Sequence, residues 1–333
     1  MLNIVRRIDR YSLMLLGTVL VATVLPCRGS VADAFHLTTM AAIALLFFLH
    51  GAKLSRAAIL AGMGNWRLHL VVLALTFAAF PVLGLAFHSL ATWVVAPSLA
   101  AGMLFLTLLP STVQSSIAFT AIARGNVPAA VCSASASNLI GIALTPLLVA
   151  LLMDGGGSGG VSGAEVRMIA LQLLLPFLLG HLSRPVTACT VERHKAVLSL
   201  VDRGSILLVV YTAFSAAVVE GLWSAVPGWQ LAAIILLCAM LLTVVMVGAT
   251  MIARRSGFSK PDEIAIVFCG SKKSLASGVP MAGVLFPAAQ VGAIILPLMI
   301  FHQLQLLACA AIAQRYAGRS PDPERAADAV LAS

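Results

Sequence analysis

Ten long apolar segments follow one another along the chain, and most polar positions fall between them. Each segment is close to the ~20 residues that a helix needs to cross the hydrocarbon core of a bilayer. The segments do not alternate polar and apolar positions, and they are much longer than the ~10-residue strands of a membrane β-barrel. The pattern therefore predicts an all-α integral membrane protein with ten transmembrane helices, which cover approximately residues 11–27, 35–52, 68–87, 94–123, 127–153, 166–183, 204–222, 229–252, 263–286 and 290–314.

The composition and the position of the charges agree with this prediction. Of the 333 residues, 60% are hydrophobic and 10% are charged, whereas a soluble domain carries about 25% charged residues. With a cytoplasmic N-terminus, 17 of the 21 lysines and arginines fall in cytoplasmic segments and only Arg28 and Arg167 fall outside. The net charge of +9 therefore indicates topology, with both termini in the cytoplasm. Its expected partner is the anionic headgroups of the bilayer rather than nucleic acid.

A Gly/Ser-rich linker at residues 154–165 divides the ten spans into two halves. Residues 1–153 hold spans one to five, and residues 166–318 hold spans six to ten, followed by a cytoplasmic tail at 319–333. Because five is an odd number, the two halves must have opposite orientations in the membrane. Inverted repeats of this kind are typical of secondary transporters.

The fourth span of each half is interrupted at a matching position. Span four contains "LLPSTVQSSIAFTAIARGN" (108–126) and span nine contains "FCGSKKSLASGVPMAGVLFP" (268–287). Pro110 and Gly270 each stand beside a polar cluster in an otherwise apolar run. The pairing predicts two discontinuous helices that cross near the midplane, where transporters bind their substrates and ions. The alternative is that both residues produce ordinary helix kinks.

Polar side chains in these breaks and in span five are the candidate binding residues. In "SASASNLIG" (133–141), Ser133 and Ser137 share one helix face, and Ser135 and Asn138 form a neighbouring stripe. The stripe could equally serve tight helix packing. Thr76 and Pro81 in span three are interpreted as packing or hinge residues. The predicted substrate- and ion-binding residues are Gln114, Ser115, Ser116, Ser135, Ser137, Asn138, Lys272, Lys273 and Ser274.

The adjacent lysines Lys272 and Lys273 need a reason to lie inside a span, because an intramembrane lysine costs about 2.5–3.5 kcal/mol. Three interpretations remain open. The lysines bind an anionic substrate, or one ammonium acts as a built-in cation and couples transport to protons, or both side chains extend to the cytoplasmic interface. Lys272 is expected to face the crossing point, and Lys273 the core of the protein or solvent.

Cysteines and histidines give no sign of an enzyme. The six cysteines form no C-x-x-C pair, and the histidines lack carboxylate partners at a useful spacing. We therefore expect no disulfide framework, no metal site beyond a sodium site, no cofactor and no catalytic residues. His302 is interpreted as a helix-packing residue rather than a proton relay.

The chain resembles the bile acid:sodium symporter superfamily, and within it the bile acid symporter-like (SBF-like) branch of ten-span bacterial proteins. The resemblance covers nearly the whole chain and is most specific in "AIARGN" (121–126), "ASNLIGIALTP" (136–146) and "CGSKKSLASGVPMA" (269–282). It implies a panel domain of spans 1, 2, 6 and 7, a core domain of spans 3–5 and 8–10, and transport of organic anions with sodium by alternating access.

One departure from this resemblance bears on the coupling ion. In sodium-coupled relatives, spans four, five and nine hold sodium through Ser, Thr and Asn side chains, backbone carbonyls and a glutamate of span nine. Ser115, Ser116, Ser135, Ser137 and Asn138 can match this pattern, but no glutamate stands beside Gly270 and two lysines follow it.

The resulting hypothesis is a transporter of a bile-acid-like anion or a small carboxylate or sulfonate, coupled to sodium or protons, in a bacterial inner membrane. The alternative is a membrane regulator or sensor that keeps the fold without transporting. The sequence leaves the substrate, transport direction and oligomeric state open.

Overall fold

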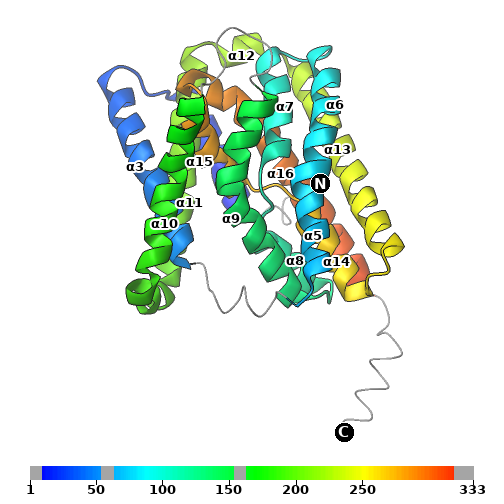
Figure 1. The fold of residues 1–333 in the computed structure, drawn as a ribbon. Helices are drawn as coiled ribbons and strands as arrows, with labels where there is room; N and C mark the ends of the chain where they lie inside the picture. The colour runs from blue at the N-terminus through cyan, green and yellow to red at the C-terminus, as the bar shows by residue number, and fades with distance from the viewer. Residues whose placement is uncertain (1–9, 54–63, 154–162, 319–333) are drawn as a thin grey trace, which may run out of the picture.

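The computed structural model describes residues 10–53, 64–153 and 163–318, and every regular element within them is helical (Figure 1). Elements before the middle of the chain are α2 (Arg10–Val24), α3 (Ser30–Lys53), α5 (Trp66–Ala74), the π-helix η1 (Leu75–Ala79), α6 (Phe80–Thr92), α7 (Pro97–Leu108), α8 (Gln114–Ile122) and α9 (Val127–Leu152). Those that follow are α10 (Gly163–Arg193), α11 (Lys195–Val219), α12 (Leu222–Ala225), α13 (Gly228–Arg255), α14 (Lys260–Gly270), α15 (Leu275–Leu285) and α16 (Ala288–Ala317).

Each predicted apolar segment falls on one helix or on a run of consecutive helices. The third segment comprises α5, η1 and α6, the fourth comprises α7 and α8, and the ninth comprises α14 and α15. Most of the predicted linker (154–165) and the predicted tail (319–333) lie outside the described residues, and α10 begins within the linker's last residues.

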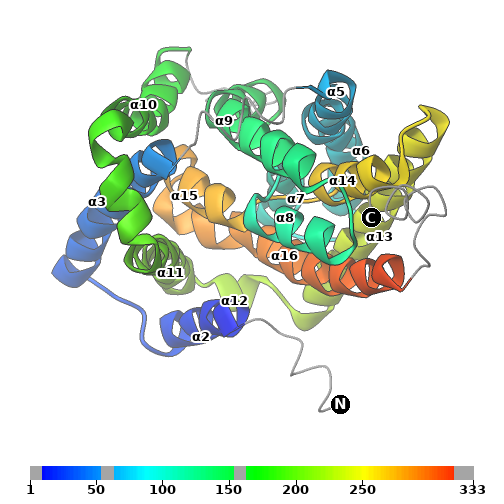
Figure 2. The ribbon, with the colours of Figure 1, turned by 90° about the horizontal axis from the view of Figure 1, so that it is seen from below.

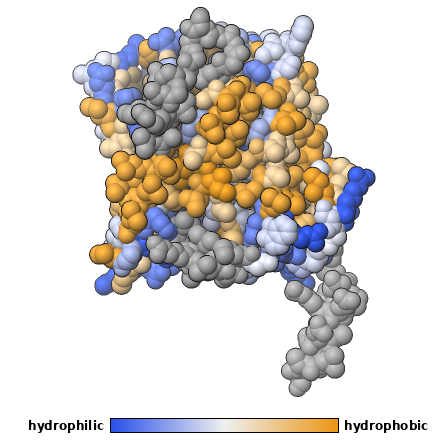
Figure 3. Space-filling view, in the orientation of Figure 1, coloured by the Kyte–Doolittle hydropathy of each residue, from blue (hydrophilic) through white to orange (hydrophobic). Residues whose placement is uncertain are grey.

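The described helices have the length and surface of a membrane protein. Six of them are long and apolar enough to cross a bilayer, counting α5 to α6 as one. Large apolar side chains such as Leu20, Val82 and Leu236 are exposed on the outside of the molecule. Figure 3 shows hydrophobic residues gathered in a band across one face, with hydrophilic residues toward both ends. A surface of this kind is stable only against lipid, so the protein is an integral, multi-pass membrane protein.

The helices form two groups that lie side by side (Figure 2). The outer group consists of α2, α3, α10 and α11, in which α3 packs on α10 and α11, and α11 packs on α2. The crossing group consists of α5 to α9 and α13 to α16, where α7 packs on α6 and α16, and α13 packs on α14 and α16. Helices α15 and α16 also contact α11, so the groups meet along one interface.

Two glycines allow α3 and α10 of the outer group to pack closely against each other. A Cβ on Gly51 of α3 would fall on the carbonyl of Phe177, and a Cβ on Gly180 of α10 would fall on the carbonyl of Phe48. The backbones of α3 and α10 are therefore close enough to exclude any side chain at these points, as small residues permit in membrane helices.

Replacing Gly180 with alanine is expected to destabilise the protein by about 1–3 kcal/mol, because an added methyl must push two packed backbones apart. A lower midpoint of thermal unfolding in detergent would show this. Gly248→Ala in α13 is the matched control, since a Cβ there meets nothing within 4 Å and alanine favours helix. Equal midpoints for the two variants would contradict the close contact.

Candidate functional site

Two unwound segments interrupt the crossing group. Helix α7 ends at Leu108 and α8 begins at Gln114, and Pro110 lies between them. Proline has no N–H and cannot continue the helical hydrogen bonds, and Leu109 before it is extended, with ψ of 157°. A Cβ on Gly141 of α9 would come within 2.6 Å of the Pro110 ring, so a glycine is required for α9 to pack here.

The second unwound segment lies between α14 and α15, at residues 271–274. Gly270 closes α14, and a Cβ at this position would lie 2.7 Å from the Cδ1 atom of Leu75. The glycine therefore serves the close approach of α5 and η1 to the end of α14. Ser274 begins the next helix as its N-cap and accepts a hydrogen bond from the N–H of Ser277 at 3.1 Å.

The two segments cross and hydrogen-bond to each other. The N–H of Ser274 donates to the carbonyl of Pro110 at 2.9 Å, and the hydroxyl of Thr112 donates to the carbonyl of Lys273 at 3.0 Å. Each break therefore satisfies backbone groups that the other leaves free, which makes irregular backbone tolerable inside a membrane.

Serines beside the first break complete the crossing. The hydroxyl of Ser111 donates to the carbonyl of Cys269 at 2.5 Å, and that of Ser116 donates to the carbonyl of Phe268 at 2.9 Å. The hydroxyl of Ser137 in α9 accepts from the N–H of Ser111 at 3.0 Å. These serines are fully buried, and their hydroxyls hold the last turn of α14 and the start of the first break in place.

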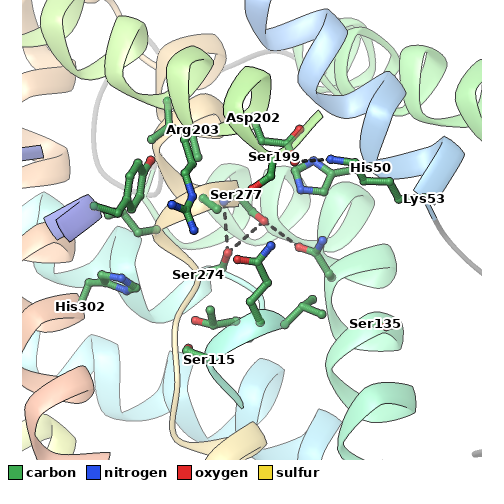
Figure 4. Close-up of a pocket in the computed structure, with 18 of the residues that line it drawn as sticks. His50, Lys53, Ser115, Ser135, Ser199, Asp202, Arg203, Ser274, Ser277 and His302 are labelled. Atoms are coloured by element: carbon green, nitrogen blue, oxygen red, sulfur yellow. Dashed lines mark hydrogen bonds and ion pairs between the residues drawn. The ribbon is translucent and has the colours of Figure 1, made fainter. Parts of the chain in front are cut away.

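A cavity of about 350 Å³ lies beside the crossing, between the outer group and the crossing group. Its lining comes from both groups and consists of Tyr11, His50, Lys53, Thr112, Val113, Gln114, Ser115, Ser135, Asn138, Leu139, Phe177, Ser199, Asp202, Arg203, Ile206, Ser274, Leu275, Ala276, Ser277, His302 and Leu306. This set is called the pocket below (Figure 4).

The crossing group gives the pocket a floor of hydroxyl and amide groups. Gln114 and Ser115 form the first turn of α8, and Ser274 caps α15. The hydroxyl of Ser277 donates to the side-chain carbonyl of Asn138 at 2.7 Å, which joins α15 to α9. Two helix N-termini therefore reach the pocket, and the positive ends of their dipoles favour an anion.

The outer group gives the pocket a charged wall. Lys53 at the end of α3 forms an ion pair with Asp202 of α11, and His50 lies one turn before it. The guanidinium of Arg203 lies 5.5 Å from the ring centroid of Tyr11 and is directed toward Ser274 and Ser277 in Figure 4. Within the described residues Arg203 has no carboxylate partner, so it is the lining cation whose charge is not neutralised.

His302 of α16 also lines the pocket and is fixed from behind by Gln305. The side-chain nitrogen of Gln305 lies 2.9 Å from the Nδ1 atom of His302 and 3.0 Å from the carbonyl of Lys273. The side-chain oxygen of Gln305 accepts the N–H of Lys273 at 3.0 Å. An amide that pairs with both backbone groups of one residue holds the second break against α16. The interpretation of His302 as a packing residue therefore missed its place in the lining.

The pocket brings together five of the nine predicted binding residues. Gln114, Ser115, Ser135, Asn138 and Ser274 line it. The other four are buried behind the lining: Ser116, Ser137, Lys272 and Lys273. The two serines bind backbone at the crossing, as described above.

The two lysines point into different surroundings. Both are 0% exposed, so neither side chain extends to the membrane interface. The ammonium of Lys272 lies 3.3 Å from the hydroxyl of Ser115 and 4.1 Å from the ring centroid of Phe119. That of Lys273 contacts backbone carbonyls beside the first break, at Thr107 and Leu109. Lys273 thus reaches the crossing directly, whereas the side chain of Ser115 lies between Lys272 and the pocket.

Sequence reasoning missed the charged wall of the pocket. His50 and Lys53 stand at the end of the second predicted span, and Asp202 and Arg203 stand just before the seventh. Lys53 and Arg203 belong to the 17 basic residues interpreted as a topology signal, because charges at span ends commonly lie in water. The available signal was the pairing of opposite charges, Lys53 and Asp202, at ends that the predicted topology places on the same side.

Comparison with known proteins identifies the family of the chain. The sequence profile of the SBF-like CPA transporter family matches residues 9–318. A protein of Pseudomonas aeruginosa named uncharacterized protein PA2026 is 58% identical over 314 residues, which are 94% of each chain. The putative symporter YfeH of Escherichia coli is 55% identical over 315 residues, or 95% of each chain.

A more distant relative links the chain to animal proteins. Sodium/bile acid cotransporter 7 of Rattus norvegicus is 28% identical over 274 residues, which cover 80% of this chain and 79% of the rat protein. The resemblance to the SBF-like branch is therefore confirmed, and the chain belongs to the SBF-like CPA transporter family.

Proposed function

We propose that this protein is a secondary active transporter that carries an organic anion by alternating access. The observation that supports this most directly is the pocket, which lies between two helix groups and is bounded by two broken helices. Transporters bind their cargo at such breaks, because helix ends and freed backbone groups converge there.

The chemistry of the pocket favours an amphipathic anion. Its charged side chains are Lys53, Asp202 and Arg203, and the first two neutralise each other. Arg203 leaves one positive charge opposite the N-termini of α8 and α15, while Leu139, Ile206 and Leu306 supply apolar surface. A bile-acid-like molecule or a small carboxylate or sulfonate matches one cation, several hydroxyls and apolar walls.

The proposed architecture has ten transmembrane helices in two inverted repeats. The outer group would be the panel domain, and the crossing group, with its discontinuous spans four and nine, would be the core domain. Both termini would lie in the cytoplasm of a bacterium, with the protein in the inner membrane. In this orientation the pocket extends from the crossing toward Lys53 and Asp202 at the cytoplasmic ends of α3 and α11. The conformation described here would then face the cytoplasm.

The coupling ion is proposed to be sodium or a proton. Ser115, Ser135 and Asn138 line the pocket with neutral oxygens that suit sodium. Glu263 is the only acidic residue that is buried in the described part of the chain. Arg254, Lys260 and Tyr316 already bind its carboxylate, so it is not a candidate ligand for the coupling ion. Lys272, held by the Ser115 hydroxyl at the edge of the pocket, is the candidate for proton coupling.

Uptake into proteoliposomes tests the function. A pool of labelled organic anions would be offered under a sodium gradient and, separately, under a proton gradient. Uptake under sodium alone would support the serine and asparagine cluster as the ion site. Uptake under protons alone, lost in Lys272→Ala, would support coupling through Lys272. Saturable binding in detergent without flux under either gradient would contradict transport and favour a membrane regulator or sensor with the same fold.

Replacing Asp202 with asparagine is expected to tighten anion binding by about tenfold. The Asp202 carboxylate and a bound anion are like charges, and like charges 4 Å apart repel by roughly 4 kcal/mol at an effective dielectric of 20. Partial solvation of the pocket lowers this repulsion toward about 1.4 kcal/mol, which corresponds to a tenfold change in affinity. The substitution also releases Lys53 from its ion pair. Competition against a labelled anion would measure the affinity. Ser199→Ala, an uncharged change in the same lining, is the control, and weaker binding by Asp202→Asn would contradict an anionic substrate.

A further inference from the structure

Three backbone carbonyls of the crossing group converge on one point and form what we call the carbonyl cage. They belong to Thr76 of η1, Thr107 of α7 and Leu109 of the first break. The Nζ atom of Lys273 lies 2.9 Å from the first and 2.7 Å from each of the others. The ring centroid of Phe80 lies 4.1 Å from the same nitrogen. Oxygens and an aromatic face around one point are a site for a cation.

The sequence explains why the carbonyl of Thr76 is free. In η1 the N–H of Phe80 bonds to the carbonyl of Leu75, five residues back. In the same π-helical register the carbonyl of Thr76 would need the N–H of residue 81, but Pro81 has none. Thr76 and Pro81 therefore act together, and their role is to leave one carbonyl without a helical partner.

The other two carbonyls are freed by the first break. The helical partner of Thr107 would be the N–H of Ser111, which bonds to Ser137 instead. Leu109 is extended, so its carbonyl points away from the axis of α7. Unpaired carbonyls inside a membrane are costly, and here a single side chain pairs with all three.

Lys273 must carry its proton to do this. A neutral amine offers two N–H groups, whereas the cage presents three acceptors within 2.9 Å. The residue is also fixed at its backbone, through Gln305 and Thr112. All of these partners lie in the crossing group, so the ammonium stays with that group when the outer group moves.

We infer that the carbonyl cage is a cation-binding site that the chain fills permanently with its own Lys273 ammonium, so that no free cation enters it. The inference concerns a positive charge that the crossing group carries whether or not the pocket is occupied, and it does not depend on which anion the pocket binds. Among the described residues, the Lys272 ammonium contacts one hydroxyl and two aromatic rings and no backbone carbonyl, so it differs from that of Lys273 although both are fully buried.

Thermal unfolding of the purified protein in detergent tests the inference without any transport substrate. The wild-type midpoint is the reference, and the salt is the same in every measurement, because a sodium ion bound at Ser115, Ser135 and Asn138 would also raise the midpoint. Lys273→Ala is expected to unfold roughly 5–10 °C lower. n-Propylammonium, which replaces the three carbons and the nitrogen that the substitution removes, is expected to restore most of this loss.

Lys272→Ala is the matched control, and its midpoint should not respond to n-propylammonium. If Lys273→Ala does not fold, Lys273→Met, which keeps the side-chain length without the charge, takes its place and should also unfold below the wild type. The inference would be overturned by a Lys273→Met midpoint equal to that of the wild type, or by equal amine rescue of both alanine variants. A loss of transport activity in liposomes would affect the proposed function but none of these results.

Discussion

Replacing Arg203 with glutamine is expected to weaken binding of an organic anion by about 10- to 100-fold, because a hydrogen bond to a charged group contributes roughly 1.5–3 kcal/mol. Arg203 lines the pocket from α11 and has no carboxylate partner within the described residues. Glutamine keeps a polar side chain but is two bonds shorter, so the variant removes both the charge and the guanidinium donors that reach the pocket. The measurement is the dissociation constant of a labelled anion in detergent, together with its rate of uptake into proteoliposomes.

Arg193→Gln at the exposed end of α10 is the matched control, since it removes one positive charge away from the pocket. Asp202→Asn should act in the opposite direction, so the two pocket variants form a pair of opposite sign. Equal affinity of wild type and Arg203→Gln would show that the anion is held elsewhere. A general weakening in both arginine variants would indicate long-range attraction rather than a contact.

Replacing Gln305 with leucine is expected to lower stability by about 2–4 kcal/mol, because each buried polar group left unpaired costs roughly 1–3 kcal/mol. Gln305 is 0% exposed, and its amide accepts the N–H of Lys273 while donating to His302 and to the Lys273 carbonyl. Leucine keeps the volume but leaves that N–H without an acceptor. The midpoint of thermal unfolding in detergent measures the loss.

Two further variants make this prediction specific. Gln305→Glu, as the neutral acid that burial favours, keeps an acceptor for the Lys273 N–H and one donor in place of two, so its stability should fall between those of wild type and Gln305→Leu. Gln314→Leu, on an exposed turn of the same helix, should unfold like the wild type. If Gln305→Leu also unfolded at the wild-type midpoint, the second break would not depend on its hydrogen bonds to α16 for stability.

Much of the fold could be predicted from the sequence, because lipid imposes a simple rule on it. Backbone groups cannot be left unpaired in a hydrocarbon core, so long apolar segments must be helices. The structure confirms an all-α membrane protein, and each predicted segment falls on a helix or a run of helices, although α10 extends ten residues beyond its predicted end and α11 begins nine residues before its predicted start. The positions of the two breaks could also be predicted, since Pro110 and Gly270 each stand beside a polar cluster in an otherwise apolar run. The inverted-repeat architecture and the membrane orientation stay predictions.

Side-chain direction could not be predicted in the same way. Lys272 and Lys273 are adjacent and equally buried, yet one lies behind Ser115 and the other enters a cage formed by residues about 160 and 200 positions away. The rotation of α14 about its axis decides this, and local sequence does not specify that rotation. The sequence predicted Ser116 and Ser137 as binding residues because of their hydroxyls, but those hydroxyls bind backbone groups at the crossing.

The sequence by itself determined that the protein lies in a membrane, where its helices and the two breaks fall, and to which family it belongs. Each of these depends on local composition or on a motif within one segment. Only the tertiary structure decided which polar groups meet. The pocket joins α3 and α11 to α8, α9, α15 and α16, and the carbonyl cage joins η1 and the first break to Lys273. Such sites arise from contacts between distant segments, whose relative rotation and depth follow from the packing of whole helices rather than from any one stretch of the chain.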